Sequence, residues 1–448
     1  MDDTPTTAKR PGRFRSLGRA LAHRNYRLFF AGQFVSMIGT WMTRTASSWL
    51  VFRLSVNQPE LQAALLGIVG FAGQFPAFFL TPLAGVMVDR WNRHRLLVVT
   101  QGLSLIQSAL LAVLAFSAEP GIGTIVILIF LNVGQGLINA FDMPARQAFM
   151  VEMIDRKEDL ANAIALNSSL VNGARLVGPA IAGVLIYLTS EAWCFVIDAV
   201  SYLAVIAALL AMHIAPRPRE VRHGPVWHGL VEGFRYTFGF APIRAILLLL
   251  ALVSFMGMPY SVLMPIFADG LGGGSGTMGF LLAASGMGAL AGALHLAART
   301  TVLGLGRTMV LATGAFGIAL IGFALSEFLW LSLVLMLVTG FGMMVEMAAS
   351  NTILQTIVDE SKRGRVMSFY TMSFLGMAPL GSLFSGFLAG AIGARTTVMI
   401  GGGACILGSI VFAFKLPQLR ILVRPIYTQM GILPQVASGL QTATTSEE

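Results

Sequence analysis

Five ionisable side chains lie inside long apolar stretches of the sequence, where a charge finds few partners. These side chains are Arg44, Asp142, Arg175, Asp198 and Glu346. An ionisable group near the centre of a membrane helix costs about 2.5 to 3.5 kcal/mol on insertion scales, so each needs an ion-pair partner, water or a function. A carboxylate in such a place can exchange a proton, and a guanidinium can attract an anion. These five residues are therefore the candidates for handling protons or charged solutes, with structural pairing as the alternative for each.

The acids at positions 142 and 346 differ in their local sequence. Arg146 follows Asp142 by one helical turn, so an ion pair is the structural interpretation of Asp142 and proton exchange is the alternative. Glu346 has no basic residue nearby in its own apolar stretch. Structural and coupling roles both stay open for Glu346, which is the better candidate for carrying a coupling proton.

The other three ionisable residues lie at different depths. Arg44 is about sixteen residues, or about 24 Å, into the first apolar stretch if that stretch is helical. It is expected to reach the outer surface, to form an ion pair or to attract an anionic substrate. Arg175, near the middle of the fifth stretch, is expected to pair with an acid or with helix carbonyls. Asp198, close to the outer end of the sixth, is expected to be solvated or hydrogen-bonded.

Twelve apolar stretches are long enough to be membrane helices, which need about 20 apolar residues each. The composition agrees, because 56% of the 448 residues are apolar and only 11% are charged, too few to cover water-soluble domains. The expected spans are 28–52, 62–88, 95–117, 122–148, 161–187, 191–213, 241–268, 276–298, 307–325, 328–354, 364–390 and 394–415.

Basic residues are confined to alternate connections between these spans. Of the 30 Lys and Arg residues, all but Arg44, Arg53, Arg175 and Arg395 lie in the termini or in every second connection. This positive-inside pattern predicts a multi-pass protein of the plasma membrane, the inner membrane in bacteria, with both termini in the cytoplasm. Membrane orientation and contact with lipid headgroups explain the net charge of +9, so nucleic acid is not an expected partner.

The chain divides into two blocks of six spans. The expected order is a cytoplasmic segment 1–27, an N-terminal bundle 28–213, a cytoplasmic linker 214–240, a C-terminal bundle 241–415 and a cytoplasmic tail 416–448. Residues 227–240 of the linker are expected to form an amphipathic helix at the membrane surface.

The two blocks align with each other as internal repeats. An offset of 204 residues aligns Gly136 with Gly340 and Asp142 with Glu346. An offset of 203 aligns three glycines of the fifth span with three of the eleventh, namely Gly173, Gly178 and Gly183 with Gly376, Gly381 and Gly386. The predicted fold class is all-α integral membrane, with twelve transmembrane helices in two pseudo-symmetric six-helix bundles.

The segment GVMVDRWNRHR after the second span resembles the signature loop of the major facilitator superfamily. The matching residues are Gly85, Asp89, Arg90, Arg93 and Arg95. The resemblance implies the major facilitator fold, in which this loop meets the cytoplasmic start of the eleventh span and latches the two bundles together. Here that span starts near Gly364, and Gly85 would let the two helices approach closely.

Three other segments resemble the bacterial branch that contains enterobactin exporters and macrolide efflux proteins. Two are NYRLFFAGQFVSMIGTWM in the first span and DMPARQAFMVEMI at the end of the fourth. The third resembles the Gly-Pro signature of antiporters in the fifth span, with Ala in place of two Gly, and comprises Ala174, Gly178, Pro179, Ala182 and Gly183. The resemblance implies export.

The fourth span departs from the pattern of many proton-coupled members. Those members carry an Arg where this chain has Asn132, three residues before Gln135 and Gly136. A neutral amide can bind substrate but cannot tune a carboxylate by its charge. This difference argues against the usual coupling arrangement and leaves Glu346 as the coupling candidate.

The predicted function is secondary active export of a small organic molecule, drug-like or siderophore-like, by a monomer that works by alternating access. Proton influx is the expected driving force, because the sequence has no nucleotide-binding motif. Cys194 and Cys405 lack metal-ligand spacing, and we expect no metal and no cofactor. A membrane enzyme would need His and carboxylates clustered at the membrane face, so an enzyme is not expected. The alternatives are an importer or facilitator for one dedicated solute and a non-transporting receptor or scaffold.

Overall fold

The computed structural model of this chain describes residues 19–117, 119–154, 156–213, 234–299 and 301–433. Most of the predicted N-terminal segment, most of the linker and the end of the tail lie outside the described residues. Within the linker, residues 234–239 are helical, which covers the last part of the predicted amphipathic helix.

The N-terminal bundle follows the first six expected spans closely, after a short 3-10 helix η1 (Arg19–Ala22). Its helices are α2 (Arg24–Leu54), α3 (Pro59–Ala72), α4 (Phe75–Arg90), α5 (Arg93–Ser117), α6 (Ile122–Glu152), α7 (Leu160–Leu188) and α8 (Glu191–Leu210), with a short 3-10 turn η2 (Lys157–Asp159) before α7.

The C-terminal bundle contains more interruptions. Its elements are α10 (Ala241–Leu252), the π-helix η3 (Val253–Gly257), the 3-10 helix η4 (Met258–Ser261), α11 (Met264–Gly270), α12 (Gly274–Ala297), α13 (Leu305–Leu325), α14 (Leu329–Ile357), α15 (Glu360–Thr371), the π-helix η5 (Met372–Gly376), α16 (Met377–Ile392) and α17 (Ala394–Gln429).

Eleven helical segments within the described residues are long and apolar enough to cross a membrane. The expected first span, α2, is not among them although it is 31 residues long. Gln33, Arg44 and several Ser and Thr residues make it less hydrophobic than the others. Eleven of the twelve expected spans therefore meet the criterion, and α2 is the exception.

Three expected spans are not continuous α-helices. The second breaks at Gly73 and Gln74, and the new helix has Pro76 in its first turn, where a missing backbone N–H has no cost. The seventh and eleventh each contain a π-turn shortly before a proline, Pro259 and Pro379. A proline inside a helix removes one backbone hydrogen bond, and local π or 3-10 geometry accommodates the loss.

The last helix is longer than predicted. We expected it to end at residue 415, but α17 continues to Gln429 and passes through Pro417 and Pro425. Residues 416–429 of the predicted tail are therefore helical. A helix can continue beyond the hydrocarbon core, so basic residues such as Lys415 and Arg420 do not require the helix to end.

The two bundles meet through glycines near one end of the molecule. On α7 and α12, a Cβ built on Gly183 would lie 2.5 Å from the Cα of Gly279. On α3 and α16, a Cβ built on Gly67 would lie 2.7 Å from the Cα of Gly386. No side chain fits at these distances, so main chain packs against main chain at both crossings. We call the end that contains these crossings, where α2 finishes, the closed end.

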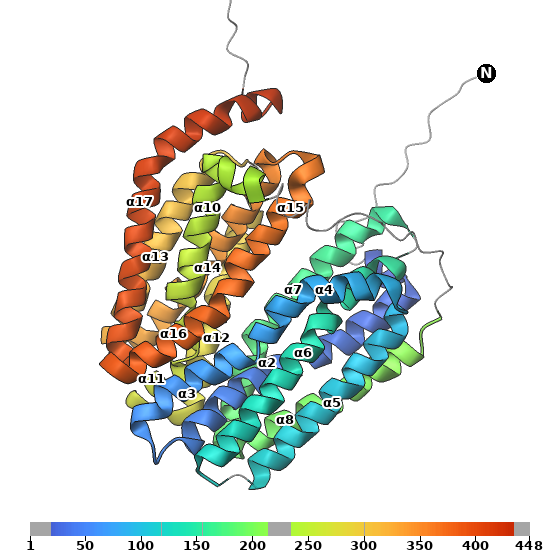
Figure 1. Cartoon of the computed structure of the whole chain (residues 1–448), viewed down its shortest axis with the longest axis vertical. Coiled ribbons are helices and arrows are strands. Elements are labelled where there is room, and N and C mark those ends of the chain that lie inside the picture. Colours follow the sequence, from blue (N-terminus) through green and yellow to red (C-terminus); the bar gives the residue numbers. More distant parts are fainter. Residues whose placement is uncertain (1–18, 118, 155, 214–233, 300, 434–448) are drawn as a thin grey trace, which may run out of the picture.

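At the opposite end, where α2 begins and α17 finishes, the bundles lie apart. Figure 1 shows the two groups of helices diverging toward this end. A Cβ built on Gly85 of α4 or on Gly364 of α15, both near this end, would have no atom within 4 Å among its described neighbours. We call this the open end.

Candidate functional site

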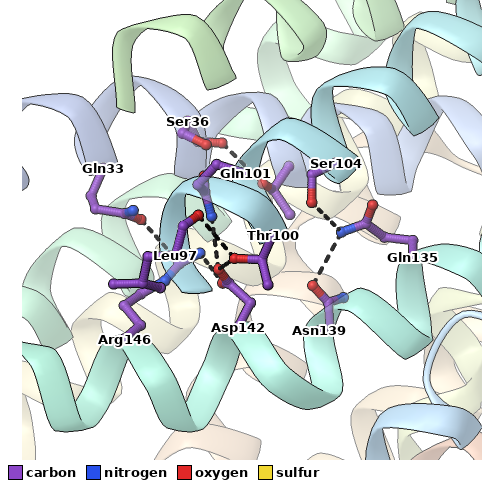
Figure 2. Close-up of polar contacts among 11 residues, drawn as sticks. Gln33, Ser36, Leu97, Thr100, Gln101, Ser104, Gln135, Asn139, Asp142 and Arg146 are labelled. Carbon is purple, nitrogen blue, oxygen red and sulfur yellow. Dashed lines mark hydrogen bonds and ion pairs between the residues drawn. The ribbon is translucent and has the colours of Figure 1, made fainter. Parts of the chain in front are cut away.

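Asp142 lies in a polar network that joins three helices of the N-terminal bundle. Figure 2 shows Thr100 and Gln101 of α5 pointing toward it, and they donate hydrogen bonds of 2.9 and 2.8 Å to Oδ1. Arg146, one turn further along α6, forms an ion pair with Oδ2 and donates a 2.5 Å hydrogen bond to Gln33 of α2. Asp142 is 3% exposed. A buried carboxylate with this many donors ties helices together.

Two amides of α6, Gln135 and Asn132, lie between this network and the closed end. Gln135 donates hydrogen bonds of 3.2 Å to Ser104 and 3.1 Å to Asn139 (Figure 2). Its Oε1 is buried and has no partner among the described residues. Asn132 donates to the carbonyl of Leu128 in its own helix, at 2.9 Å. The amide of Asn132 is therefore bonded within its own helix.

The predicted signature loop joins α4 to α5 at the open end. Arg93 forms an ion pair of 2.7 Å with Glu152 at the end of α6, and the amide N–H of Arg95 donates to Asn92. The side chain of Asp89 lies outside the described residues. The close helix approach expected at Gly85 is not made in this conformation, because the bundles are apart there. The loop ties α5 to α6 within one bundle.

Glu346 of α14 is buried without a charged partner in the described part of the chain. It is 1% exposed, and Ser350 donates a 3.0 Å hydrogen bond to its Oε1. Its Oε2 is buried and unpaired within the described residues. Tyr370 of α15 and Cys405 of α17 are close enough to interact with it electrostatically. Such a carboxylate can take up or release a proton without breaking an ion pair.

Asp198 of α8 is more deeply buried than the sequence predicts. It is hydrogen-bonded, by Thr43 at 2.9 Å and Ser108 at 2.6 Å, but it is only 1% exposed and therefore not solvated. Its Oδ1 is buried and without a partner in the described segments. Helix α8 packs between α2 and α5, so a residue seven positions from its start is already inside the bundle. The hydroxyl residues Thr43 and Ser108 in neighbouring spans were the signal in the sequence that Asp198 could have buried hydrogen-bond partners.

Arg44 of α2 and Arg175 of α7 lie beside each other at the boundary between the bundles. Both guanidinium carbons are 5.3 Å from the ring centroid of Trp41, and the two like charges repel each other. Arg175 also interacts electrostatically with Tyr260 of the C-terminal bundle, whose hydroxyl is hydrogen-bonded to Ser285. The acid or carbonyl partner expected for Arg175 is not found among the residues that the structure describes.

The small residues of the fifth span line α7 on two sides. A Cβ built on Gly178 would lie 2.5 Å from the Cβ of Trp41, so α7 packs directly on α2 at the arginine pair. Gly183 forms the crossing with α12, where the carbonyl of Pro179 also approaches Gly279. Ala174 and Ala182 are 3% and 0% exposed and complete the packing face of α7.

Sequence comparisons agree with this architecture. The model of a family described as "Transmembrane secretion effector" matches residues 18–425. The chain is 27% identical to the Staphyloferrin A transporter of Staphylococcus aureus, with 88% of this chain and 96% of that protein covered. It is 30% identical to the multidrug efflux pump Tap of Mycolicibacterium fortuitum, with 86% and 93% covered. It is 26% identical to the enterobactin exporter EntS of Escherichia coli, with 90% and 93% covered.

Solved structures show the same fold at lower sequence identity. An inward-facing, unoccupied bacterial homologue of the human lysosomal transporter Spinster has a TM-score of 0.65 and 16% identity, with 90% of this chain and 98% of that chain covered. A POT peptide transporter in complex with sulfate has a TM-score of 0.68 and 11% identity, with 89% and 95% covered. Two six-helix bundles, a family match over most of the chain and relatives that are transporters lead to one conclusion: the chain belongs to the transmembrane secretion effector family, within the major facilitator superfamily of membrane transporters.

Proposed function

We propose that this protein exports a small organic molecule, siderophore-like or drug-like, across the bacterial inner membrane. Support comes from the relatives, which include an enterobactin exporter and a multidrug efflux pump of nearly the same length. The protein would act as a monomer, since each chain contains both bundles.

The observation that carries the proposal is the arrangement of the bundles, which touch at the closed end and lie apart at the open end. Alternating access requires two bundles that can rock about a site between them. The glycine crossings at 67–386 and 183–279 correspond to each other in the two repeats, because one joins the second span to the eleventh and the other joins the eighth to the fifth. A receptor or scaffold would not need this symmetry.

The orientation follows from charge. Basic residues gather at the open end, at the signature loop, at Arg156 and from Lys362 to Arg365, so we assign the open end and both termini to the cytoplasm. The conformation described here is then inward-facing and ready to take up cargo from the cytoplasm. Helix α2, which is 31 residues long, would be the first span and would bring the number of spans to twelve.

Protons are the proposed coupling ion, and Glu346 is the proposed carrier. It is buried, has no basic partner in the described part of the chain and keeps one oxygen unpaired. Asp142 differs because its carboxylate already forms an ion pair with Arg146. Movement of α14 against its neighbours would expose Glu346 to one side and then to the other.

The test is accumulation of fluorescent amphipathic compounds in energised cells that express the wild type, Glu346→Gln or the exposed-residue control Glu327→Gln. We expect lower accumulation in wild-type and control cells, with the difference abolished by a protonophore and by Glu346→Gln. Higher accumulation in wild-type cells would indicate import. No difference for any compound, siderophores included, would contradict export.

A further inference from the structure

We propose that Arg44 and Arg175 form the binding site for an anionic group of the transported molecule, with the ring of Trp41 as its apolar floor. This inference rests on the proposed transport function and narrows its substrate class to organic anions, carboxylates above all.

The two guanidinium groups are unusual because they lack acidic partners. Other arginines of the spans are paired: Arg53 with Glu191 at 2.6 Å, and Arg146 with Asp142. No acidic group pairs with Arg44 or Arg175 in the described segments, and their like charges repel each other. A structural role for two adjacent cations would require a counter-ion from the protein. Arg44 is exposed and Arg175 is half-buried, so both guanidinium groups are open to a ligand anion, and such an anion would compensate the two charges.

Snorkelling to the nearer surface does not explain Arg44. It lies ten residues before the end of α2, about 15 Å from the closed end by helical rise. Its guanidinium packs on Trp41, one turn closer to the middle of the bundle, so the side chain turns away from that surface. Arg175 is near the middle of α7 and reaches neither surface.

The position of the pair suits a transported ligand. Arg44 and Arg175 belong to two helices of one bundle, and Tyr260 beside Arg175 belongs to the other. A ligand bound here touches both bundles and can respond to their relative movement. Each planar guanidinium fork can donate two parallel hydrogen bonds to the oxygens of a carboxylate, and the indole ring can pack against the carbon skeleton of the ligand.

The experiment is calorimetric titration of the purified protein in detergent with aromatic carboxylates and their uncharged amides. The series is naphthalene-1-carboxylate, naphthalene-1,8-dicarboxylate and naphthalene-1-carboxamide. The variants are Arg44→Gln and Arg175→Gln, and the control is Arg395→Gln. Arg395 is an exposed arginine 3.9 Å from the exposed Glu327, so its replacement removes the same charge away from the site.

We expect each carboxylate to bind about tenfold more tightly than the amide, with the dicarboxylate tightest, and each Gln variant to lose about tenfold in affinity. The control should bind like the wild type. If a Gln variant fails to fold, Arg44→Lys and Arg175→Lys replace it; they keep the charge and should keep the preference for the carboxylate while losing affinity for the dicarboxylate. The proposal is overturned if no carboxylate binds more tightly than the amide, including if none binds, or if the Gln variants match the control.

Binding in detergent needs neither a gradient nor a transport direction, so the two proposals can fail separately. A protein that binds carboxylates through both arginines but moves nothing outward would contradict export alone. A protein that exports uncharged compounds without anion preference would contradict the anion site alone.

Discussion

Ser350 lies one turn after Glu346 on α14 and donates a 3.0 Å hydrogen bond to its carboxylate. At the offset of 204 residues, Ser350 is the counterpart of Arg146, which holds Asp142 on α6. The two repeats therefore keep the same one-turn contact but supply a cation in one bundle and a hydroxyl in the other. A carboxylate bound by a neutral hydroxyl can lose its charge without leaving a buried cation unpaired.

This difference predicts that Glu346→Gln uncouples transport from the proton gradient. In proteoliposomes with an imposed pH gradient, uptake of substrate should fall by about tenfold or more, because the carrier of the coupling proton is gone. Substrate affinity should stay within about twofold, because Glu346 and the arginine pair belong to different bundles. Glu346→Asp should retain part of the gradient dependence. Gradient-driven transport that persists in Glu346→Gln would exclude this residue as the coupling site.

Asp142→Asn should destabilise the protein, because Arg146 keeps its charge in a partly buried position. Removing one partner of a buried pair costs about 3 to 5 kcal/mol, and the 18% exposure of the Arg146 side chain lowers this to about 2 kcal/mol. Thermal unfolding in detergent measures the loss. The double variant Asp142→Asn/Arg146→Gln should recover part of it. A double variant no more stable than the sum of the two single losses would show that the pair contributes no coupling energy.

Alanine at the glycine crossings should shift the conformational equilibrium. Gly183→Ala or Gly67→Ala places a methyl group at 2.5 to 2.6 Å from the opposing helix, so the closed end can no longer pack as it does here. Spin labels at Glu158→Cys and Arg363→Cys, at the open ends of the two bundles, should then move closer together. Gly102→Ala is the matched control, because a Cβ there meets no neighbour within 4 Å. An unchanged label distance in both crossing variants would show that the crossings do not set this equilibrium.

The proposed orientation predicts the labelling of introduced cysteines. Glu119→Cys and Glu327→Cys, in connections at the closed end, should react with an impermeant maleimide in intact cells. Glu360→Cys, at the open end, should react only after permeabilisation. Cys194 and Cys405 are buried and should contribute little background. The reverse labelling pattern would place the termini outside.

The spans could be predicted from the sequence because length and apolarity are local properties. The expected span 122–148 corresponds to Ile122–Glu152, and 191–213 to Glu191–Leu210. The break at Gly73 was missed because the apolar character continues through it, although Pro76 was a usable signal. The extension of α17 was missed because charged residues end a span but not a helix.

The sequence predicts which residues are functional candidates but not which residues they contact. A guanidinium or carboxylate in an apolar stretch is visible in the sequence, and so is the one-turn spacing of Asp142 and Arg146. The meeting of Arg44 with Arg175 joins residues 131 positions apart, and only the packing of α7 on α2 brings them together. The burial of Asp198 likewise depends on two neighbouring helices, which a single span does not reveal.

The two glycine crossings are contacts at which one bundle can rotate relative to the other. Because no side chains interlock at Gly67–Gly386 or Gly183–Gly279, rotation there requires no change of rotamer and little loss of packing. In the proposed cycle, the contacts that must form and break on every turnover are therefore those at the open end, where the bundles lie apart in this conformation. In the proposed cycle, the rate would then be set by contacts at the open end, far from the crossings that permit the motion.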